Sequence, residues 1–201
     1  MAGEQLATAE LSRLGVEGDR ILQVKKGTDR VMTARTRPLL LRHHAKLNDS
    51  GEVLVGERAW DSAEVAASVT AAAGEGTHLV RSDPEQRFDI LPLLIVTDGA
   101  LEAVGYDNRR FRPNLVIGGV PGLTEREWEG GQLRIGPVLI GMEDLRGRCI
   151  MTTFDPDSGA QDLNVLRRVQ KEFGGVLGLN SFVRVPGRVS VGDLVEFQPR
   201  K

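Results

Sequence analysis

Sulfur and aromatic side chains are scarce in this sequence, and the scarcity of cysteine limits its chemistry. The 201 residues include one cysteine, Cys149, so no disulfide bond can form within the chain. An iron–sulfur cluster held by four thiolates of this chain is likewise excluded. If the protein carries out redox chemistry, electrons must therefore reach it from a separate protein.

Excess charge and long apolar runs are also lacking. The formal net charge of -2 gives no electrostatic argument for a nucleic acid partner, although a single site can still be locally basic. Apolar runs such as residues 91–96 are far too short to cross a bilayer. The first residues lack the charged and apolar regions of a signal peptide, so we expect a cytoplasmic protein with no membrane partner.

Glycine is abundant, and the pattern of apolar residues between the glycines predicts strands. The 24 glycines, set against one tyrosine and two tryptophans, indicate many turns and a β-rich fold. Residues 21–26 and 30–34 flank a three-residue turn as in a hairpin. Further strands are expected at residues 52–56, 77–81, 91–96, 114–118, 133–135, 138–141, 182–185, 189–191 and 194–197.

Helices are fewer than strands in this interpretation. Residues 60–73 are rich in alanine, and residues 100–104 leave room for a short helix after a buried strand. Residues 162–173 have apolar side chains at helical spacing, namely Leu163, Leu166, Val169 and Phe173. Because strands dominate and recur at short spacing, we predict a mixed, β-rich fold, a closed or nearly closed β-barrel with a few peripheral helices.

Arginine, glycine and small polar residues concentrate in four segments, 15–20, 97–100, 109–114 and 147–159. Arginine binds phosphate through a planar fork and keeps its charge. Backbone amides at the helix start after Thr97 would also suit an anion. Cys149 as a thiolate is a soft ligand for a transition metal, and the adjacent Arg148 would favour that thiolate. An anionic organic cofactor that carries a metal would use all of these groups together.

Each of these features also has a plain structural interpretation. A lone cysteine is usually a small buried hydrophobic residue. The arginines of residues 109–112 could form a solvated face or a salt-bridge network. Residues 155–159 are expected to form a turn whatever the function. His43 and His44 are expected to be surface residues, because no cysteine or carboxylate lies near them at metal-binding spacing.

Four motifs in a fixed order resemble one known family. They are Gly18-Asp19-Arg20, Arg110-Phe111-Arg112-Pro113-Asn114, Arg148-Cys149 with Thr152-Thr153 and Asp155-Pro156-Asp157-Ser158-Gly159, and Val191-Gly192-Asp193. In this order the sequence resembles the MOSC (molybdenum cofactor sulfurase C-terminal) domain family, which includes the mitochondrial amidoxime-reducing components and their bacterial relatives. The resemblance implies a β-barrel MOSC fold, with an N-terminal β-barrel-like region at residues 1–85 and the MOSC core at residues 86–201, packed as one compact unit.

The resemblance also implies a cofactor and the residues that hold it. The cofactor is a molybdenum cofactor of the molybdopterin type, with Cys149 as metal ligand and Arg148 beside it as a second catalytic residue. The side chains expected to hold the pterin and its phosphate are Arg20, Thr97, Asp98, Arg110, Arg112 and Asn114. Asn180, expected in a loop before the last strands, is added from its position. Pyridoxal phosphate binding is a further property implied at the level of the family.

The implied activity is the two-electron reduction of N-hydroxylated small molecules, such as amidoximes and hydroxylamines. A separate flavin, cytochrome or iron–sulfur protein would supply the electrons. Two alternatives stay open. The chain could carry molybdenum cofactor or sulfur without reducing an N–O bond, with a persulfide on Cys149. It could also be a plain β-barrel scaffold whose arginines make salt bridges, in which case replacing Arg112 would change stability alone.

The sequence departs from the family pattern in two places. Relatives usually begin with a strand that ends in a Pro-Val-Lys-Ser-like segment, and this chain starts where that segment should already have ended. The first strand is therefore expected to be missing, either because the start is truncated or because this member does without the strand. Truncation would weaken cofactor binding. Some relatives carry another cysteine three residues before the metal ligand, where this chain has Arg146. That position cannot contribute a thiolate.

Overall fold

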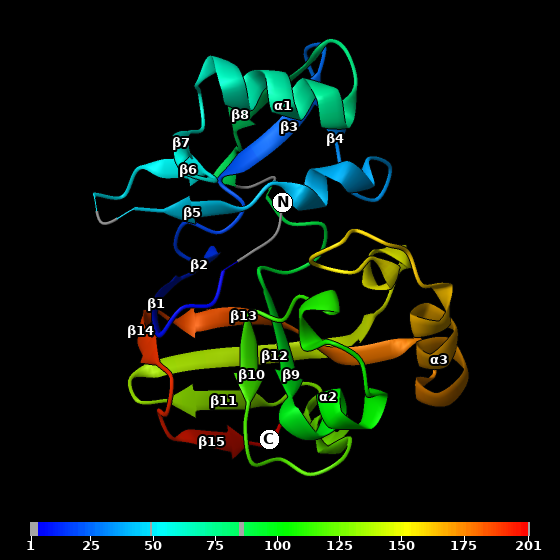
Figure 1. Cartoon of the computed structure of the whole chain (residues 1–201). Helices are drawn as coiled ribbons and strands as arrows, with labels where there is room; N and C mark the ends of the chain where they lie inside the picture. The colour runs from blue at the N-terminus through cyan, green and yellow to red at the C-terminus, as the bar shows by residue number, and fades with distance from the viewer. Residues whose placement is uncertain (1–3, 49, 85–86, 201) are drawn as a thin grey trace. The chain divides into compact units, whose positions relative to one another are not determined.

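The computed structural model describes residues 4–48, 50–84 and 87–200, and the chain divides into two compact units (Figure 1). The first unit consists of residues 4–5, 20–48, 50–84, 87 and 154–162. The second consists of residues 6–19, 88–153 and 163–200. Residues 85 and 86, where the sequence suggests a domain boundary, lie outside the described residues, and the division into residues 1–85 and 86–201 stays a prediction.

The first unit combines two small antiparallel sheets with one helix. One sheet has the order β4-β3-β8 and the other the order β5-β6-β7. The elements are β3 (Leu22–Lys26), β4 (Arg30–Met32), the 3-10 helix η1 (Pro38–Arg42), β5 (Ala45–Leu47), β6 (Val53–Val55), β7 (Arg58–Ala59), α1 (Ala63–Ala73) and β8 (Thr77–Arg81). The side chain of Ser62 caps α1, and α1 packs against β8 and η1. The predicted hairpin is confirmed, because β3 and β4 pair antiparallel from Val24 with Met32 to Lys26 with Arg30.

The second unit is built on a six-stranded sheet that curls into a half-barrel, in the order β10-β9-β13-β12-β11-β15. Only β10 and β9 run parallel to each other. The six strands are β9 (Leu93–Thr97), β10 (Leu115–Ile117), β11 (Gln132–Ile135), β12 (Val138–Gly147), β13 (Val176–Val185) and β15 (Val195–Gln198). A smaller sheet has the order β14-β1-β2, with β1 (Thr8–Ser12), β2 (Gly15–Val16) and β14 (Gly187–Ser190).

Helices cover parts of this second unit. They are α2 (Asp98–Val104), the 3-10 helices η3 (Asn108–Arg110), η4 (Thr124–Trp128) and η5 (Ile150–Thr153), and α3 (Leu163–Phe173). One apolar core lies around Ile95, Leu133, Ile140 and Leu179, and a second forms where α2 and α3 pack on the sheet near Val96 and Phe173. Among the described residues, no helix has the length and apolar character needed to span a membrane. The prediction of a mixed, β-rich fold with few helices is confirmed.

The predicted helix at residues 162–173 is confirmed as α3, in which Val169 and Phe173 are buried as the apolar spacing indicates. The buried face also includes Val165, whereas Leu163 in the first turn is exposed. One local prediction was wrong. Asn180 does not lie in a loop. It is buried inside β13, a ten-residue strand that begins directly after two glycines and pairs with both β12 and β9.

Candidate functional site

Cys149 lies in the short connection between the end of β12 and η5, and its side chain is exposed. The backbone N–H of Arg148 donates to the carbonyl of Gly175 at 2.9 Å, which continues the pairing of β12 with β13 up to the cysteine. The carbonyl of Cys149 accepts from the backbone N–H and the hydroxyl of Thr152, at 3.1 and 3.0 Å. These bonds fix the backbone of Cys149 on both sides and leave its thiol accessible.

Arg148 places a partly desolvated cation beside this thiol. Its Nη2 donates to the carbonyl of Phe111 at 2.5 Å, while its Nε is buried and has no hydrogen-bond partner. Burial, and then the positive charges of Arg146 and Arg112, lower the pKa of Arg148 to about 10, against an opposing effect of Cys149. The guanidinium therefore keeps its charge at neutral pH. A bound anion would favour this charged form, which would offset the cost of its burial and the repulsion from the neighbouring arginines.

Arg146 is held by a chain of hydrogen bonds on the same part of the sheet. Its Nη1 donates to the Asn180 side-chain oxygen at 2.9 Å, and the Asn180 side-chain nitrogen donates to Asp144 at 2.8 Å. Irregularities in the pairing of β12 with β13 lie between Met142 and Leu145 and again between Leu145 and Gly147. Such bulges redirect side chains at the end of a strand. Asn180 therefore orients Arg146 through its amide oxygen.

The segment at residues 108–114 supplies two further arginines. Arg110 donates from Nη1 to the carbonyl of Thr153 at 3.0 Å, which ties η3 to η5. Arg112 has a positive φ of 54°, a left-handed backbone conformation that costs a non-glycine residue free energy. Arg109, in contrast, is paired with Asp107 at 2.7 Å, as the salt-bridge interpretation of this segment expects.

Asn114 extends the sheet toward the same place. Its backbone N–H and its side-chain oxygen bond to the carbonyl and the N–H of Leu94, at 2.8 and 2.9 Å. Leu94 is also the register partner of Asn180 in β13. Asn114 and Asn180 thus flank one residue of β9, and the Asn114 amide nitrogen also donates to Asp19 at 3.4 Å.

Thr97 and Asp98 lie at the other end of β9, three residues and roughly 10 Å along the strand from Leu94. The Thr97 hydroxyl caps α2 by accepting from Ala100 at 3.2 Å and donates to the buried Glu125 at 2.8 Å. The Asp98 carboxylate accepts from the amides of residues 99, 119 and 120, and the last two are the main causes that lower its pKa. The Asp98 side chain thus binds the loop at residues 118–122, whereas the Thr97 side chain binds Glu125 and the start of α2. The contact of either side chain with a cofactor stays a prediction.

Arg20 belongs to the first unit. It has a positive φ of 53°, and the hydroxyl of Ser82 donates to its carbonyl at 2.6 Å. In the same unit the predicted turn at residues 155–159 is confirmed, because one Asp155 carboxylate oxygen accepts from the amides of residues 157 and 158. The role of Arg20 in holding a cofactor stays a prediction.

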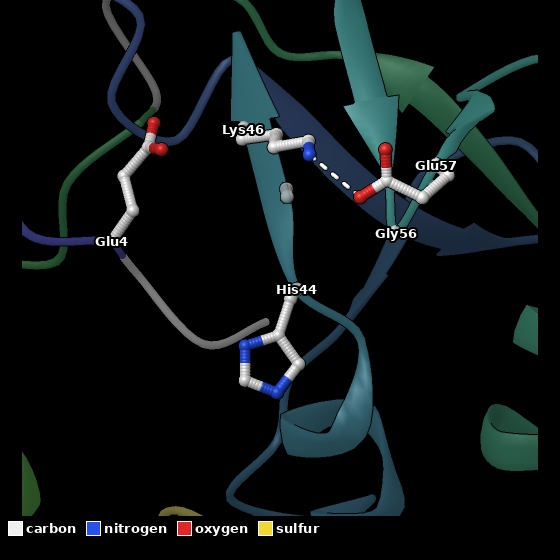
Figure 2. Close-up of a pocket in the computed structure, with 6 residues that line it drawn as sticks. Glu4, His44, Lys46, Gly56 and Glu57 are labelled. Carbon is white, nitrogen blue, oxygen red and sulfur yellow. Dashed lines mark hydrogen bonds and ion pairs between the residues drawn. The ribbon is translucent and has the colours of Figure 1, made fainter.

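A hollow of about 170 Å³ lies elsewhere in the first unit (Figure 2), lined by Glu4, His44, Ala45, Lys46, Gly56 and Glu57. Lys46 and Glu57 form an ion pair of 2.7 Å across it. His44 is exposed as predicted, whereas His43 is half-buried, because its ring bonds to Ser68 of α1 at 2.9 Å. Burial lowers the pKa of His43. Among the residues that the structure describes, no group of three His, Cys, Asp or Glu side chains is placed to hold a metal ion.

The site around Cys149 fits an anionic cofactor that brings a metal. It offers one accessible thiol, a buried guanidinium nitrogen without a partner, and further arginines whose charges act on it. Sequence reasoning named Arg148, Arg110, Arg112 and Asn114, but it gave no role to Arg146 or Phe111. The spacing of two between Arg146 and Arg148 in a strand could have suggested a shared face, whereas the Phe111 contact left no signal in the sequence.

Residues 97–196 match the sequence model of the MOSC domain. This chain is a MOSC-domain protein. The matched range includes every candidate site residue of the MOSC domain except Arg20. It therefore contains the whole cluster around Cys149.

Two relatives of the MOSC protein match parts of it. Human mitochondrial amidoxime reducing component 2 is 38% identical over 80 residues, which are 37% of this chain and 23% of that protein. Molybdenum cofactor sulfurase 2 of Culex quinquefasciatus is 41% identical over 66 residues, 33% of this chain and 8% of that protein. The chain therefore matches less than a quarter of the length of either relative.

A solved structure supports the fold of the MOSC protein. The crystal structure of the YuaD protein from Bacillus subtilis superposes with a TM-score of 0.51 at 15% identity, covering 98% of this chain and 88% of that one. At this identity the likeness concerns the fold alone. The β-rich half-barrel is thus an architecture found in a bacterial protein of similar extent.

Proposed function

We propose that this MOSC protein binds molybdenum cofactor and reduces N-hydroxylated small molecules with electrons from a separate protein. The observation that carries the proposal is the exposed Cys149 thiol beside Arg148, whose buried Nε has no hydrogen-bond partner. A soft thiolate next to desolvated cations suits a transition metal held in an anionic organic ligand. The relative named an amidoxime reducing component supports this choice of substrate class.

The side chains would divide the work. Cys149 would provide the thiolate ligand, and Arg110, Arg112 and Arg148 would bind anionic groups of the cofactor, with Asn114 donating or accepting beside them. Arg20, Thr97, Asp98 and Asn180 complete the set implied by the family resemblance. When bound, the cofactor would supply two electrons, so that an N–OH group and two protons give N–H and water. Arg148, cationic at neutral pH, would stabilise negative charge near the metal.

The partners follow from the same proposal. The electron donor would be a separate flavin, cytochrome or iron–sulfur protein, because the single cysteine of this chain cannot hold a four-thiolate iron–sulfur cluster. The substrate would be a small N-hydroxylated compound, and the expected location is the cytoplasm. Pyridoxal phosphate binding remains a family-level prediction.

Molybdenum content tests the proposal directly. The full chain is purified from a host that makes molybdenum cofactor, and molybdenum per chain is measured for the wild type, Cys149→Ser and Arg134→Gln. Arg134 is exposed on β11, so its loss serves as a charge control. We expect close to stoichiometric molybdenum in the wild type and the control and loss in Cys149→Ser, with little change in Tm because the thiol is exposed. Wild-type protein without molybdenum would contradict the proposal.

Activity is measured next on the loaded protein. Dithionite replaces the donor protein, and the conversion of benzamidoxime to benzamidine is followed by chromatography. We expect turnover by the wild type and by Arg134→Gln but not by Cys149→Ser. If the molybdenum-loaded protein reduces no N–O substrate, the proposed reductase activity is rejected and the proposed cofactor binding is retained.

The second candidate is a carrier of molybdenum cofactor or sulfur. The exposure of Cys149 favours it, because a persulfide carrier needs an accessible thiol, and one relative is named a molybdenum cofactor sulfurase. Mass spectrometry of the intact chain after incubation with a cysteine desulfurase and cysteine would detect added sulfur. Cyanide-labile sulfur on Cys149 together with absent N–O reduction would select the carrier over the reductase.

A further inference from the structure

Arg146 and Arg148 form a pair of cations beside Cys149 that no carboxylate among the described residues neutralises. Arg146 bonds to the amide of Asn180 and Arg148 to the carbonyl of Phe111, and neither arginine takes part in an ion pair. Other arginines of the second unit do, such as Arg109 with Asp107 and Arg188 with Glu10. Arg146 and Arg148 are two residues apart, at the end of β12 and directly after it.

Asn180 holds Arg146 in this position without cancelling its charge. The Asn180 amide is oriented by two bonds, because its oxygen accepts from Arg146 while its nitrogen donates to Asp144. Asp144 is thus linked to the Arg146 guanidinium through the Asn180 amide and forms no ion pair with it. A neutral amide that fixes a cation in place is suited to presenting that charge to a ligand.

The thiol that follows these two charges is accessible. Cys149 is exposed and comes directly after Arg148, and two residues separate it from Arg146 in the chain. A small molecule can therefore reach this thiol from solution.

We propose that Arg146, oriented by Asn180 and acting with Arg148, recruits a negatively charged group to Cys149, and that the substrates of this site carry a carboxylate, phosphate or sulfonate. Arg146 would be a specificity-determining residue and Asn180 its positioning residue. The statement about substrates rests on the proposed reductase function, whereas the recruitment of anions to the thiol can be measured without it. The phosphate of the cofactor is the other possible anion, and the experiment separates the two.

The first arm uses the full chain produced without molybdenum cofactor. Second-order rates of alkylation of Cys149 are measured with iodoacetate, which is an anion, and with neutral iodoacetamide. Both reagents attack the same thiolate of the same single cysteine, so their rate ratio does not depend on its ionised fraction. We expect Arg146→Gln to lower the ratio about fivefold, the effect of one unit charge a few ångströms away in water.

Matched variants control this arm. Arg146→Lys keeps the charge and should keep the ratio, as should Arg134→Gln on the exposed face of β11. Asn180→Asp places a carboxylate against Arg146 and should lower the ratio as Arg146→Gln does, while circular dichroism reports whether the fold is kept. Added salt should shrink the wild-type ratio through screening. An Arg146→Gln ratio equal to that of the wild type would overturn the proposal.

The second arm uses the molybdenum-loaded chain. KM is compared for benzamidoxime and for 4-carboxybenzamidoxime, which differ in one carboxylate. We expect Arg146→Gln to raise KM about fivefold for the carboxylated substrate alone, with molybdenum per chain unchanged. Loss of molybdenum in Arg146→Gln would instead assign Arg146 to the cofactor phosphate and reject the substrate role. Absence of molybdenum in the wild type rejects the reductase function. In that case the alkylation ratio by itself decides whether Arg146 recruits anions to Cys149.

Discussion

Arg148 and Phe111 are in contact through both backbone and ring. Arg148 Nη2 donates to the Phe111 carbonyl at 2.5 Å, and the guanidinium carbon lies 5.7 Å from the centre of the Phe111 ring. Phe111 is fully buried between η3 and β10. The contact therefore fastens the end of β12, with Cys149, to the segment that carries Arg110 and Arg112.

Replacing Arg148 with lysine should break this contact while the charge is kept. A lysine has no planar group to lie on the ring and one nitrogen in place of a fork. We expect the free energy of unfolding to fall by about 1–3 kcal/mol, as when a hydrogen bond from a charged donor is lost, and molybdenum retention to fall with it. Urea denaturation measures the first quantity, with Arg134→Lys on the exposed face of β11 as the control. Equal stability of Arg148→Lys and the wild type would show that the Phe111 contact contributes nothing.

Arg112 offers a test of backbone strain at the site. Among the described residues, the non-glycine residues with positive φ are Arg20 and Arg112, both of which are candidate cofactor ligands. Arg112→Gly and Arg112→Ala remove the same side-chain contacts, but glycine tolerates a φ of 54° and alanine does not. We expect the glycine variant to be more stable than the alanine variant by about 1 kcal/mol, and both to lose molybdenum equally. If the two variants unfold at the same denaturant concentration, the strain argument fails.

Gly99 should be intolerant of any side chain. A Cβ at this position would lie 2.2 Å from the Val120 carbonyl oxygen and 2.5 Å from the Gly122 nitrogen, so the N-terminus of α2 would have to move from the 118–122 loop. We expect Gly99→Ala to cost about 1–3 kcal/mol of unfolding free energy, as overpacking does. Gly147→Ala, where nothing lies within 4 Å, serves as the matched control and should be nearly neutral. Similar thermal melts for the two variants would contradict this account.

Glu125 should make stability depend on pH. Burial raises the pKa of Glu125, and this effect outweighs the hydrogen bond from Thr97, which lowers the pKa. The folded state then binds more protons than the unfolded state between the ordinary and the raised pKa, so stability is greatest below the ordinary value and declines as pH rises through the raised one. Glu125→Gln, which can still accept from Thr97, removes the ionisable group.

We therefore expect Glu125→Gln to be at least as stable as the wild type near neutral pH, with the difference disappearing in acid below the ordinary pKa of a glutamate. Thermal melts across a pH series measure both limits. A Gln variant that is less stable than the wild type at neutral pH would mean that the ionised carboxylate stabilises the fold.

Local sequence determined most of the secondary structure. The hairpin of β3 and β4, the helix capped by Thr97 and the buried run of β9 follow from turn residues, caps and apolar periodicity, which act between near neighbours. The order of the Arg-rich motifs and Cys149 also indicated the family, which the match to the MOSC domain bears out. The hairpin, the cap and the apolar run depend on contacts within a few residues, and the motif order is a property of the sequence itself, so a single sequence displays them all.

The arrangement of the site was decided only by the tertiary structure. Arg146 and Asn180 are 34 residues apart, and the sequence placed Asn180 in a loop, yet the pairing of β12 with β13 makes them hydrogen-bond partners. Thr97 and Asp98 were grouped with the site by motif, but their side chains bind Glu125 and the 118–122 loop. A strand pattern specifies which faces are apolar, whereas register and bulges between distant strands decide which polar side chains meet.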